Sequence, residues 1–272
     1  MWKINKPDIK KATIKDISEL NLDPGNRINL RQLYIDYDNQ NGDVSKAQIS
    51  TIPDDIAKKI YKTYPNTRNG KALAYIRDEL NKNVYRCPYC GIGASSDTLD
   101  HYMPESEFHA LAVCRMNLVP MCHKCNNLKK NKSYKDFVHC YYENFPNGIF
   151  FVANITIVKN CIIADFDFDS IVINDTNLEN KLRKQAKEIQ LFDRIKKEAN
   201  EYITSLCIDC DVPDNKSLKD WLKNKLKKEE NRYGKNDWRC AVVRGLFSYS
   251  SLDISMIEKH KLNRPINNDG GI

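Results

Sequence analysis

The sequence has no uninterrupted apolar run that approaches the length of a membrane span, and no apolar leader follows its first residues, Met1 to Lys6. A transmembrane helix needs about 20 consecutive apolar residues, so we expect no membrane span. Without a leader, the chain shows no signal for export. Because cysteines commonly pair in exported proteins, we expect the ten cysteines to be reduced thiols of a cytoplasmic protein.

Patterns that define several large protein classes are also missing. No glycine-rich phosphate-binding loop is present, which excludes nucleotide hydrolysis through that motif. An internal repeat and a long heptad pattern are both absent, which excludes solenoids and long coiled coils. No helix-turn-helix or finger array is recognisable, so no such module would read a DNA sequence.

The charge balance is modest. The chain has 43 Lys and Arg against 36 Asp and Glu, a formal net charge of +7. A basic excess suits a polyanionic partner, but an ordinary soluble protein with a lysine-rich surface has the same balance. The charge therefore supports a nucleic-acid partner without establishing one.

The chain does contain two Cys-x-x-Cys pairs, Cys87/Cys90 and Cys122/Cys125. Four thiolates at this spacing predict a tetrahedral zinc that joins the two ends of one small unit. Gly91 follows the first pair and can take the positive φ that a turn around zinc commonly needs. The alternative is four buried structural thiols, because free cysteine is often a small core residue.

Residues between and beside these pairs suit phosphodiester hydrolysis. That reaction needs a base with a near-neutral pKa, a divalent cation on the scissile phosphate, and oxygen ligands for the cation. His101 can be the base, because an unperturbed histidine has a pKa of about 6.5. Asp100 and Asn126 offer the hard oxygens that Mg²⁺ or Mn²⁺ prefers. The sequence thus predicts a second metal site, chemically distinct from the thiolate site.

Residues 86–132, which contain these motifs, resemble the HNH endonucleases, whose ββα-metal core surrounds a single catalytic cation with a hairpin and one helix. The resemblance implies that Asp100 is a ligand of the catalytic cation and that His101 is the general base. It also implies that Asn117 pins the loop. Asn126 takes the third position of the motif, where its amide oxygen can bind a hard cation.

Asn127 competes with Asn126 for that third position. We prefer Asn126 because it directly follows Cys125 and because two lysines fall three and four residues further on, on the same helical face. These are Lys129 and Lys130, which we predict to contact the phosphate backbone of a nucleic acid.

The resemblance implies a metal-dependent endonuclease that acts on nucleic acid, with DNA favoured over RNA. The layout of a basic arm, a nuclease core and a helical tail is similar to that of the HNH subunits that accompany an ATPase in Septu-type and retron-linked anti-phage systems. It implies a nuclease effector in a bacterial defence complex, with an ATPase or another defence protein as partner. Two alternatives stay open: a stand-alone restriction-like DNA endonuclease, and a zinc-ribbon module that binds nucleic acid without catalysis.

The chain as a whole predicts an α+β protein with three regions. Residues 1–85 form an N-terminal arm and helical region, 86–145 the nuclease core, and 146–272 a C-terminal sheet and helical region. Within the first region, residues 1–25 have few apolar anchors, so we expect an arm that docks a partner or a loosely packed terminus. Helices are predicted to start at Pro53 and to span 70–82.

The C-terminal pattern predicts one small antiparallel sheet followed by helices. The expected elements are a helix over 134–142, a sheet over 149–173, one long helix over 177–206, helices over 214–228 and 238–249, and a frayed tail over 263–272. The lysine-rich face of the long helix is either solvated or an extension of a nucleic-acid track.

Other side chains that invite a metal or acidic-site interpretation lack partners at ligand spacing. We assign them to packed or solvated positions: His109, His123, His139, Cys140, the pair Cys207/Cys210, and the alternating Asp165, Asp167 and Asp169.

Overall fold

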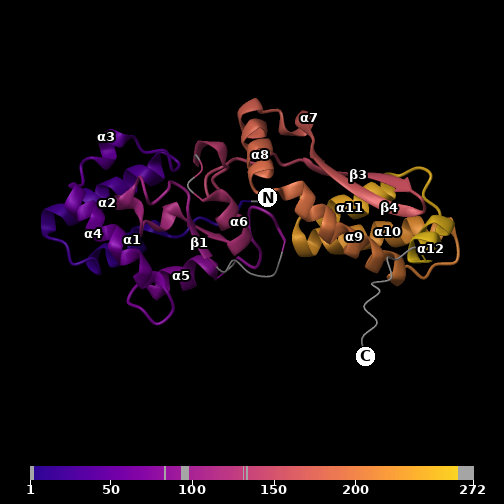
Figure 1. Ribbon diagram of the computed structural model, residues 1–272, viewed down its shortest axis with the longest axis horizontal. Helices are drawn as coiled ribbons and strands as arrows, with labels where there is room; N and C mark the ends of the chain where they lie inside the picture. The colour runs from indigo at the N-terminus through magenta and orange to yellow at the C-terminus, as the bar shows by residue number, and fades with distance from the viewer. Residues whose placement is uncertain (1–2, 83, 93–97, 131, 133, 263–272) are drawn as a thin grey trace. The chain divides into compact units, whose positions relative to one another are not determined.

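The computed structural model describes residues 3–82, 84–92, 98–130, 132 and 134–262. The chain divides into two compact units, a first unit of Met1–Phe145 with Asn180–Ile189 and a second unit of Pro146–Glu179 with Gln190–Ile272. Figure 1 shows their elements coloured along the chain. The mixture of helices and strands confirms the predicted α+β class, whereas the division into three regions stays a prediction. Within the described residues, no helix combines the length and apolar character that crossing a membrane requires.

The first unit begins with five helices: α1 (Ile9–Ser18), α2 (Pro24–Asn39), α3 (Lys46–Ile49), α4 (Asp54–Thr63) and α5 (Ala74–Asn81). Local sequence explains their starts. The Asp23 carboxylate accepts a hydrogen bond from the Asn26 amide, and Pro24 occupies the first turn of α2. Two acidic residues lie in the first turn of α4, where the helix dipole favours negative charge. Helices α4 and α5 confirm the predictions at Pro53 and 70–82.

The prediction of an arm over residues 1–25 is wrong. Helix α1 forms within this stretch, and its Ile17 is buried, as are Leu20 and Leu22, which follow the helix. The Asp16 carboxylate is also buried and lies 2.5 Å from the Arg115 guanidinium. Arg115 lies far from Asp16 in the sequence, so the composition of residues 1–25 gave no sign that this ion pair holds helix α1 in place.

The ββα core follows the helices. Strand β1 (Thr98–His101) pairs antiparallel with β2 (Leu118–Met121), and His101 lies opposite Leu118. Helix α6 (His123–Lys129) comes directly after β2. This hairpin and helix are the arrangement that the HNH resemblance implied.

The predicted helix over 134–142 does not form. Only Tyr134–Asp136 makes a 3₁₀ turn, and the buried segment after it is irregular. Side chains satisfy its backbone instead: Gln185 accepts from the Val138 amide, and the Tyr102 hydroxyl donates to the Phe137 carbonyl. Because these groups find partners elsewhere, the backbone does not need helical hydrogen bonds.

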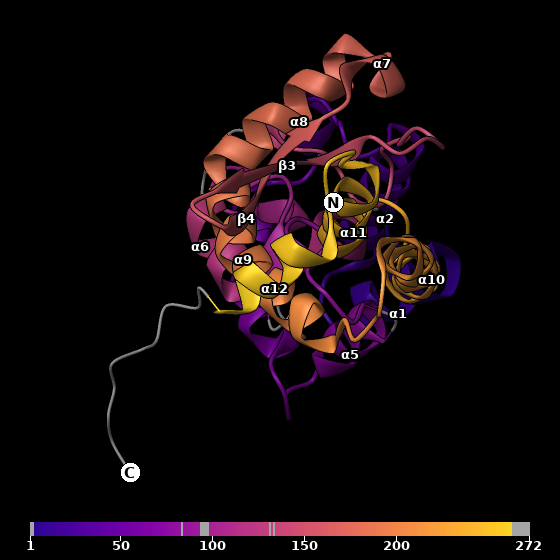
Figure 2. The same ribbon diagram turned by 90° about the vertical axis from the view of Figure 1, so that its right-hand side faces the viewer.

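The second unit contains a long hairpin and a set of helices. Strands β3 (Phe151–Val158) and β4 (Cys161–Phe168) pair antiparallel across a two-residue turn, where Lys159 and Asn160 both have positive φ. Helices α9 (Leu191–Asp209) and α11 (Trp238–Ser248) pack against the hairpin (Figure 2). A Cβ on Gly245 would lie 2.6 Å from the Ala153 carbonyl oxygen, so glycine permits the close approach of α11 to β3. The helices of this unit are α7 (Ser170–Ile173), α9 (Leu191–Asp209), α10 (Asn215–Tyr233), α11 (Trp238–Ser248) and α12 (Ile254–Leu262). Helix α8 (Thr176–Glu188) begins in the second unit, and its residues from Asn180 onward belong to the first.

Two predictions for this region need correction. The single helix over 177–206 is two helices, α8 and α9, because Gln190 takes a left-handed conformation with φ of 53°. The end of the predicted sheet, 171–173, is helix α7, whose first amides are capped by the Asp169 carboxylate. The helices predicted over 214–228 and 238–249 are confirmed as α10 and α11. The predicted tail lies outside the described residues.

Candidate active site and metal centre

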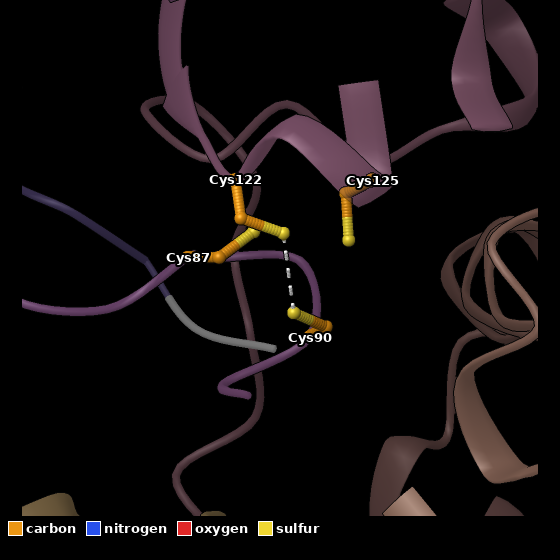
Figure 3. Close-up of side chains that lie close together, drawn as sticks. All are labelled: Cys87, Cys90, Cys122 and Cys125. Atoms are coloured by element: carbon orange, nitrogen blue, oxygen red, sulfur yellow. Dashed lines mark hydrogen bonds between the residues drawn. The ribbon is translucent and has the colours of Figure 1, made fainter. Parts of the chain in front are cut away.

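Four cysteines converge as the spacing predicted (Figure 3). Cys87 and Cys90 lie in a tight turn, while Cys122 and Cys125 lie at the start of α6. Their Sγ atoms are all within 4.8 Å of one another, and those of Cys90 and Cys122 are 3.8 Å apart. Zinc–sulfur bonds of about 2.3 Å in a tetrahedron place sulfurs about 3.8 Å apart. The donor set therefore fits structural zinc.

Backbone geometry and the thiols' own chemistry support this fit. Gly91 has φ of 65°, and its amide donates to the Cys87 carbonyl at 2.9 Å, which closes the turn. The neighbouring thiols of Cys125 and Cys87 lower the pKa of the Cys122 thiol, whereas burial raises the pKa of the Cys87 thiol. Because the thiolate is the form that binds zinc, metal binding would release protons from this cluster.

His101 ends strand β1 and is buried. Its Nε2 lies 2.9 Å from the Ala112 carbonyl oxygen. A carbonyl can only accept, so Nε2 carries the proton and Nδ1 of the neutral ring keeps a lone pair. Burial lowers the pKa of His101 to about 4, so the ring is neutral near pH 7. His101 therefore has the tautomer and charge of a base that acts through Nδ1.

Two further side chains contact the His101 ring. The Tyr64 ring lies edge-on to it, with centroids 4.4 Å apart, and the Tyr64 hydroxyl donates to the Leu99 carbonyl. The Glu105 Oε2 atom lies 3.4 Å from Nδ1. Tyr64, from the N-terminal helical region, thus holds the His101 ring in place. The Nδ1 atom of the ring faces the carboxylate of Glu105, four residues later in the chain.

Asp100 lies beside His101 on β1, and it is almost fully buried. Its Oδ2 atom is 2.9 Å from the Nζ atom of Lys129. Burial raises the pKa of Asp100, and the Lys129 charge partly opposes that rise. Lys129 is the ion-pair partner of this carboxylate among the described residues, so an oxygen remains for a hard cation.

The prediction that Lys129 contacts phosphate needs correction. Its side chain is 0% exposed, and its ammonium also donates to the His101 carbonyl at 2.8 Å. The helix turns Lys129 inward onto β1, where it neutralises Asp100 and holds the strand. Lys130 is exposed at the end of α6, so its predicted phosphate contact stays a prediction.

Asn117 is fully buried at the end of the segment that joins β1 to β2. Its Oδ1 accepts from the Met103 amide at 2.8 Å, and its Nδ2 donates to the Met103 carbonyl at 3.1 Å. The Tyr37 hydroxyl donates to the same Oδ1 and lies 3.2 Å from Nε2 of His139. These bonds clamp the two ends of the segment together, with Tyr37 of α2 as an additional support.

Asn126 and Asn127 differ in their surroundings. Asn126 is half-buried and donates from Nδ2 to the Thr98 hydroxyl at 3.0 Å, which links α6 to the start of β1. Asn127 is exposed and contacts His123 on the outer face of α6. Asn126 is therefore the asparagine that contacts β1, the strand that carries Asp100 and His101.

Sequence reasoning missed the partners that hold the site. Glu105 lies four residues after His101, a spacing that the sequence shows. Tyr37, Tyr64 and the Ala112 carbonyl carry no sequence signal, because only the fold brings them to the hairpin. The discounted His139 is a packed residue as expected, and burial lowers its pKa to about 3.

The comparisons with known proteins agree with this geometry. Residues 87–132 match the family of HNH endonucleases, so this part of the chain is an HNH endonuclease domain, a domain that implies a phosphodiesterase. Such nucleases bind nucleic acid and typically use a divalent metal, and the four-cysteine cluster suggests structural zinc beside it.

A relative among characterised sequences is Protein ea31 of Escherichia phage lambda, which is 31% identical over 83 residues. The alignment covers 30% of this chain and 28% of that protein, so most of each lies outside it. No solved structure matches the chain.

Proposed function

We propose that the protein is an endonuclease that hydrolyses phosphodiester bonds of DNA, with His101 as general base and Mg²⁺ or Mn²⁺ as the catalytic cation. The observation that carries this proposal is the fixed tautomer of His101. Its Nε2 is committed to the Ala112 carbonyl, so the Nδ1 lone pair is the one available to a water molecule.

In this mechanism each side chain has a separate task. His101 takes a proton from the attacking water at Nδ1. Asp100 and Asn126 offer the carboxylate and amide oxygens that would hold the cation, which supplies charge stabilisation at the scissile phosphate. The Lys129 ammonium favours the ionised form of Asp100 and so opposes the effect of burial on its pKa. Asn117 keeps the segment between the strands in one conformation, so the base does not need to reorganise during reaction.

Substrate and metal requirements test the proposal together. Purified protein is incubated with plasmid, single-stranded DNA and transfer RNA, each with Mg²⁺, with Mn²⁺ and with EDTA. We expect cleavage of DNA that stops in EDTA. Asp100→Ala and Asn126→Ala should raise the Mg²⁺ concentration needed for half-maximal rate. Binding of DNA without cleavage under every metal condition would instead support the zinc-module alternative.

A narrower form of the proposal makes the protein the nuclease effector of a cytoplasmic anti-phage complex with an ATPase or similar partner. Its support is the absence of a recognisable DNA-reading module, because a nuclease without sequence recognition needs another restraint. The ten free cysteines suit a reducing compartment. The isolated protein should then cut slowly and without sequence preference. Rapid cutting at one defined DNA sequence would favour the restriction-like alternative.

A further inference from the structure

Helix α10 of the second unit presents a face with unusual composition. Every exposed residue of α10 from position 223 onward is Lys, Arg or Asn: Lys223, Asn224, Lys227, Lys228, Asn231 and Arg232. We call this set the α10 basic face. Figure 2 shows the helix nearly end-on, beside α11, against which it packs. Its apolar anchors Leu218 and Leu222 are buried, so the basic face is the side that is left to solvent.

The acidic residues of the same helix do not neutralise this face. Glu229 is buried and pairs with Lys225, while Glu230 pairs with Arg244 of α11. Asp220 is exposed three residues before Lys223 and so lies beside the first lysine of the face, but it forms no ion pair with a described residue. None of the four cationic side chains of the face has an ion pair or hydrogen bond with another described residue. Four unneutralised positive charges are therefore held on about three turns of one rigid helix.

The second unit as a whole is not basic, which makes this face a local feature. Of the 43 Lys and Arg, 26 fall in the first unit and 17 in the second, whereas the 36 Asp and Glu divide as 18 and 18. A general lysine excess therefore does not explain the α10 basic face. Its Arg232 also lies over the Tyr233 ring, 5.1 Å from the centroid, which places an aromatic group at the edge of the face.

We propose that the α10 basic face binds the phosphate backbone of a nucleic acid and so gives the nuclease a second contact with its substrate. Positions four apart on the helix are about 6 Å apart along its axis, and a DNA strand carries one phosphate per about 3.4 Å. Lysine, arginine and asparagine all donate to phosphate oxygens, and such contacts do not depend on base sequence. A membrane is the less favoured polyanion, since the face has no large exposed apolar residue.

This inference rests on the proposed nuclease function, but it can fail separately. The test is equilibrium binding of the full-length protein to a DNA duplex and to an RNA duplex, at a series of NaCl concentrations, without added Mg²⁺ or Mn²⁺. One variant carries Lys223→Gln, Lys227→Gln, Lys228→Gln and Arg232→Gln. A control removes charge from three exposed lysines of the same unit that lie outside α10: Lys159→Gln, Lys197→Gln and Lys259→Gln.

Each lost phosphate contact lowers the slope of log K against log salt by about 0.9. We expect the α10 variant to lower the slope by roughly 3 to 4 and to weaken binding by tenfold or more at low salt, while the control changes the slope by less than about 1. An equal effect of both variants, or none from the α10 variant, would overturn the inference. Loss on DNA alone or on RNA alone identifies the nucleic acid. A wild-type protein that binds nucleic acid through α10 but never cleaves it would contradict only the proposed function.

Discussion

The two units use charge in different ways. The first unit holds most of the excess positive charge, but it buries ionic groups at the positions that hold the HNH domain together: Asp16 with Arg115, and Asp100 with Lys129. The second unit has no such excess, and it gathers exposed cations on one helix. Buried pairs fix geometry because an unpaired charge in the interior is costly, whereas exposed charges stay available to a partner. The comparison teaches that lysine content alone does not locate a nucleic-acid surface.

The largest expected contrast between the units comes from their cysteines. Cys125→Ala should abolish zinc binding and unfold the first unit, because structural zinc contributes about 10 kcal/mol or more to small metal-held folds. Elemental analysis and thermal unfolding measure both effects. Cys207→Ala, a buried cysteine of the second unit outside the cluster, is the matched control and should keep full zinc. Stoichiometric zinc in the Cys125→Ala protein would contradict zinc binding by the four thiolates.

The next contrast sets a buried ion pair against an exposed one. Arg115→Ala leaves the buried Asp16 carboxylate without its main counter-charge, which should cost about 3–5 kcal/mol of unfolding free energy. Lys196→Ala breaks the Lys196–Asp165 pair on the surface of the second unit and should cost less than about 1 kcal/mol. Urea unfolding measures both. Similar costs for the two variants would mean that helix α1 is not anchored as described.

Some features of the fold and the site could be predicted from the sequence, whereas others depend on contacts between distant segments. The two Cys-x-x-Cys pairs located the zinc ligands, and the Asp-His dipeptide stands between them, because each of these patterns is visible within a few residues of the chain. A proline and two acidic residues at the helix start located α4, and the pattern of apolar residues located α10 and α11. The same local reading treated residues 1–25 as an arm and Lys129 as a surface cation. Both mistakes concern side chains whose buried partners come from distant segments, Asp16 with Arg115 and Lys129 with Asp100.

The break between α8 and α9 has another cause. The apolar spacing continues through Ile189 and Leu191, both of which are buried, so periodicity alone predicts one helix. The helix is broken by the left-handed conformation of Gln190, and glutamine is not a residue type that favours this conformation.

A smaller effect concerns pH and the buried His139 of the first unit. Burial lowers its pKa to about 3, compared with about 6.5 in the unfolded chain. The unfolded chain therefore binds the extra proton first, so the stabilising effect is complete above pH 6.5 and is lost as the pH falls from 6.5 towards 3. His139→Gln should make the unfolding free energy less steep in that window, by at most about 1.4 kcal/mol per pH unit. An unchanged slope would mean that His139 is already solvated in the folded protein.

The central claim is that His101 is the base of a nuclease site held by the cysteine cluster. The most direct test is the rate of Mg²⁺-dependent plasmid cleavage by His101→Ala, with zinc content measured on the same sample. The matched control is His123→Ala, which removes an exposed imidazole from α6 of the same domain. We expect the cleavage rate to fall by about 10²–10⁴-fold in His101→Ala with full zinc, and to stay near the wild-type rate in His123→Ala. Normal cleavage by a zinc-loaded His101→Ala protein would contradict the central claim.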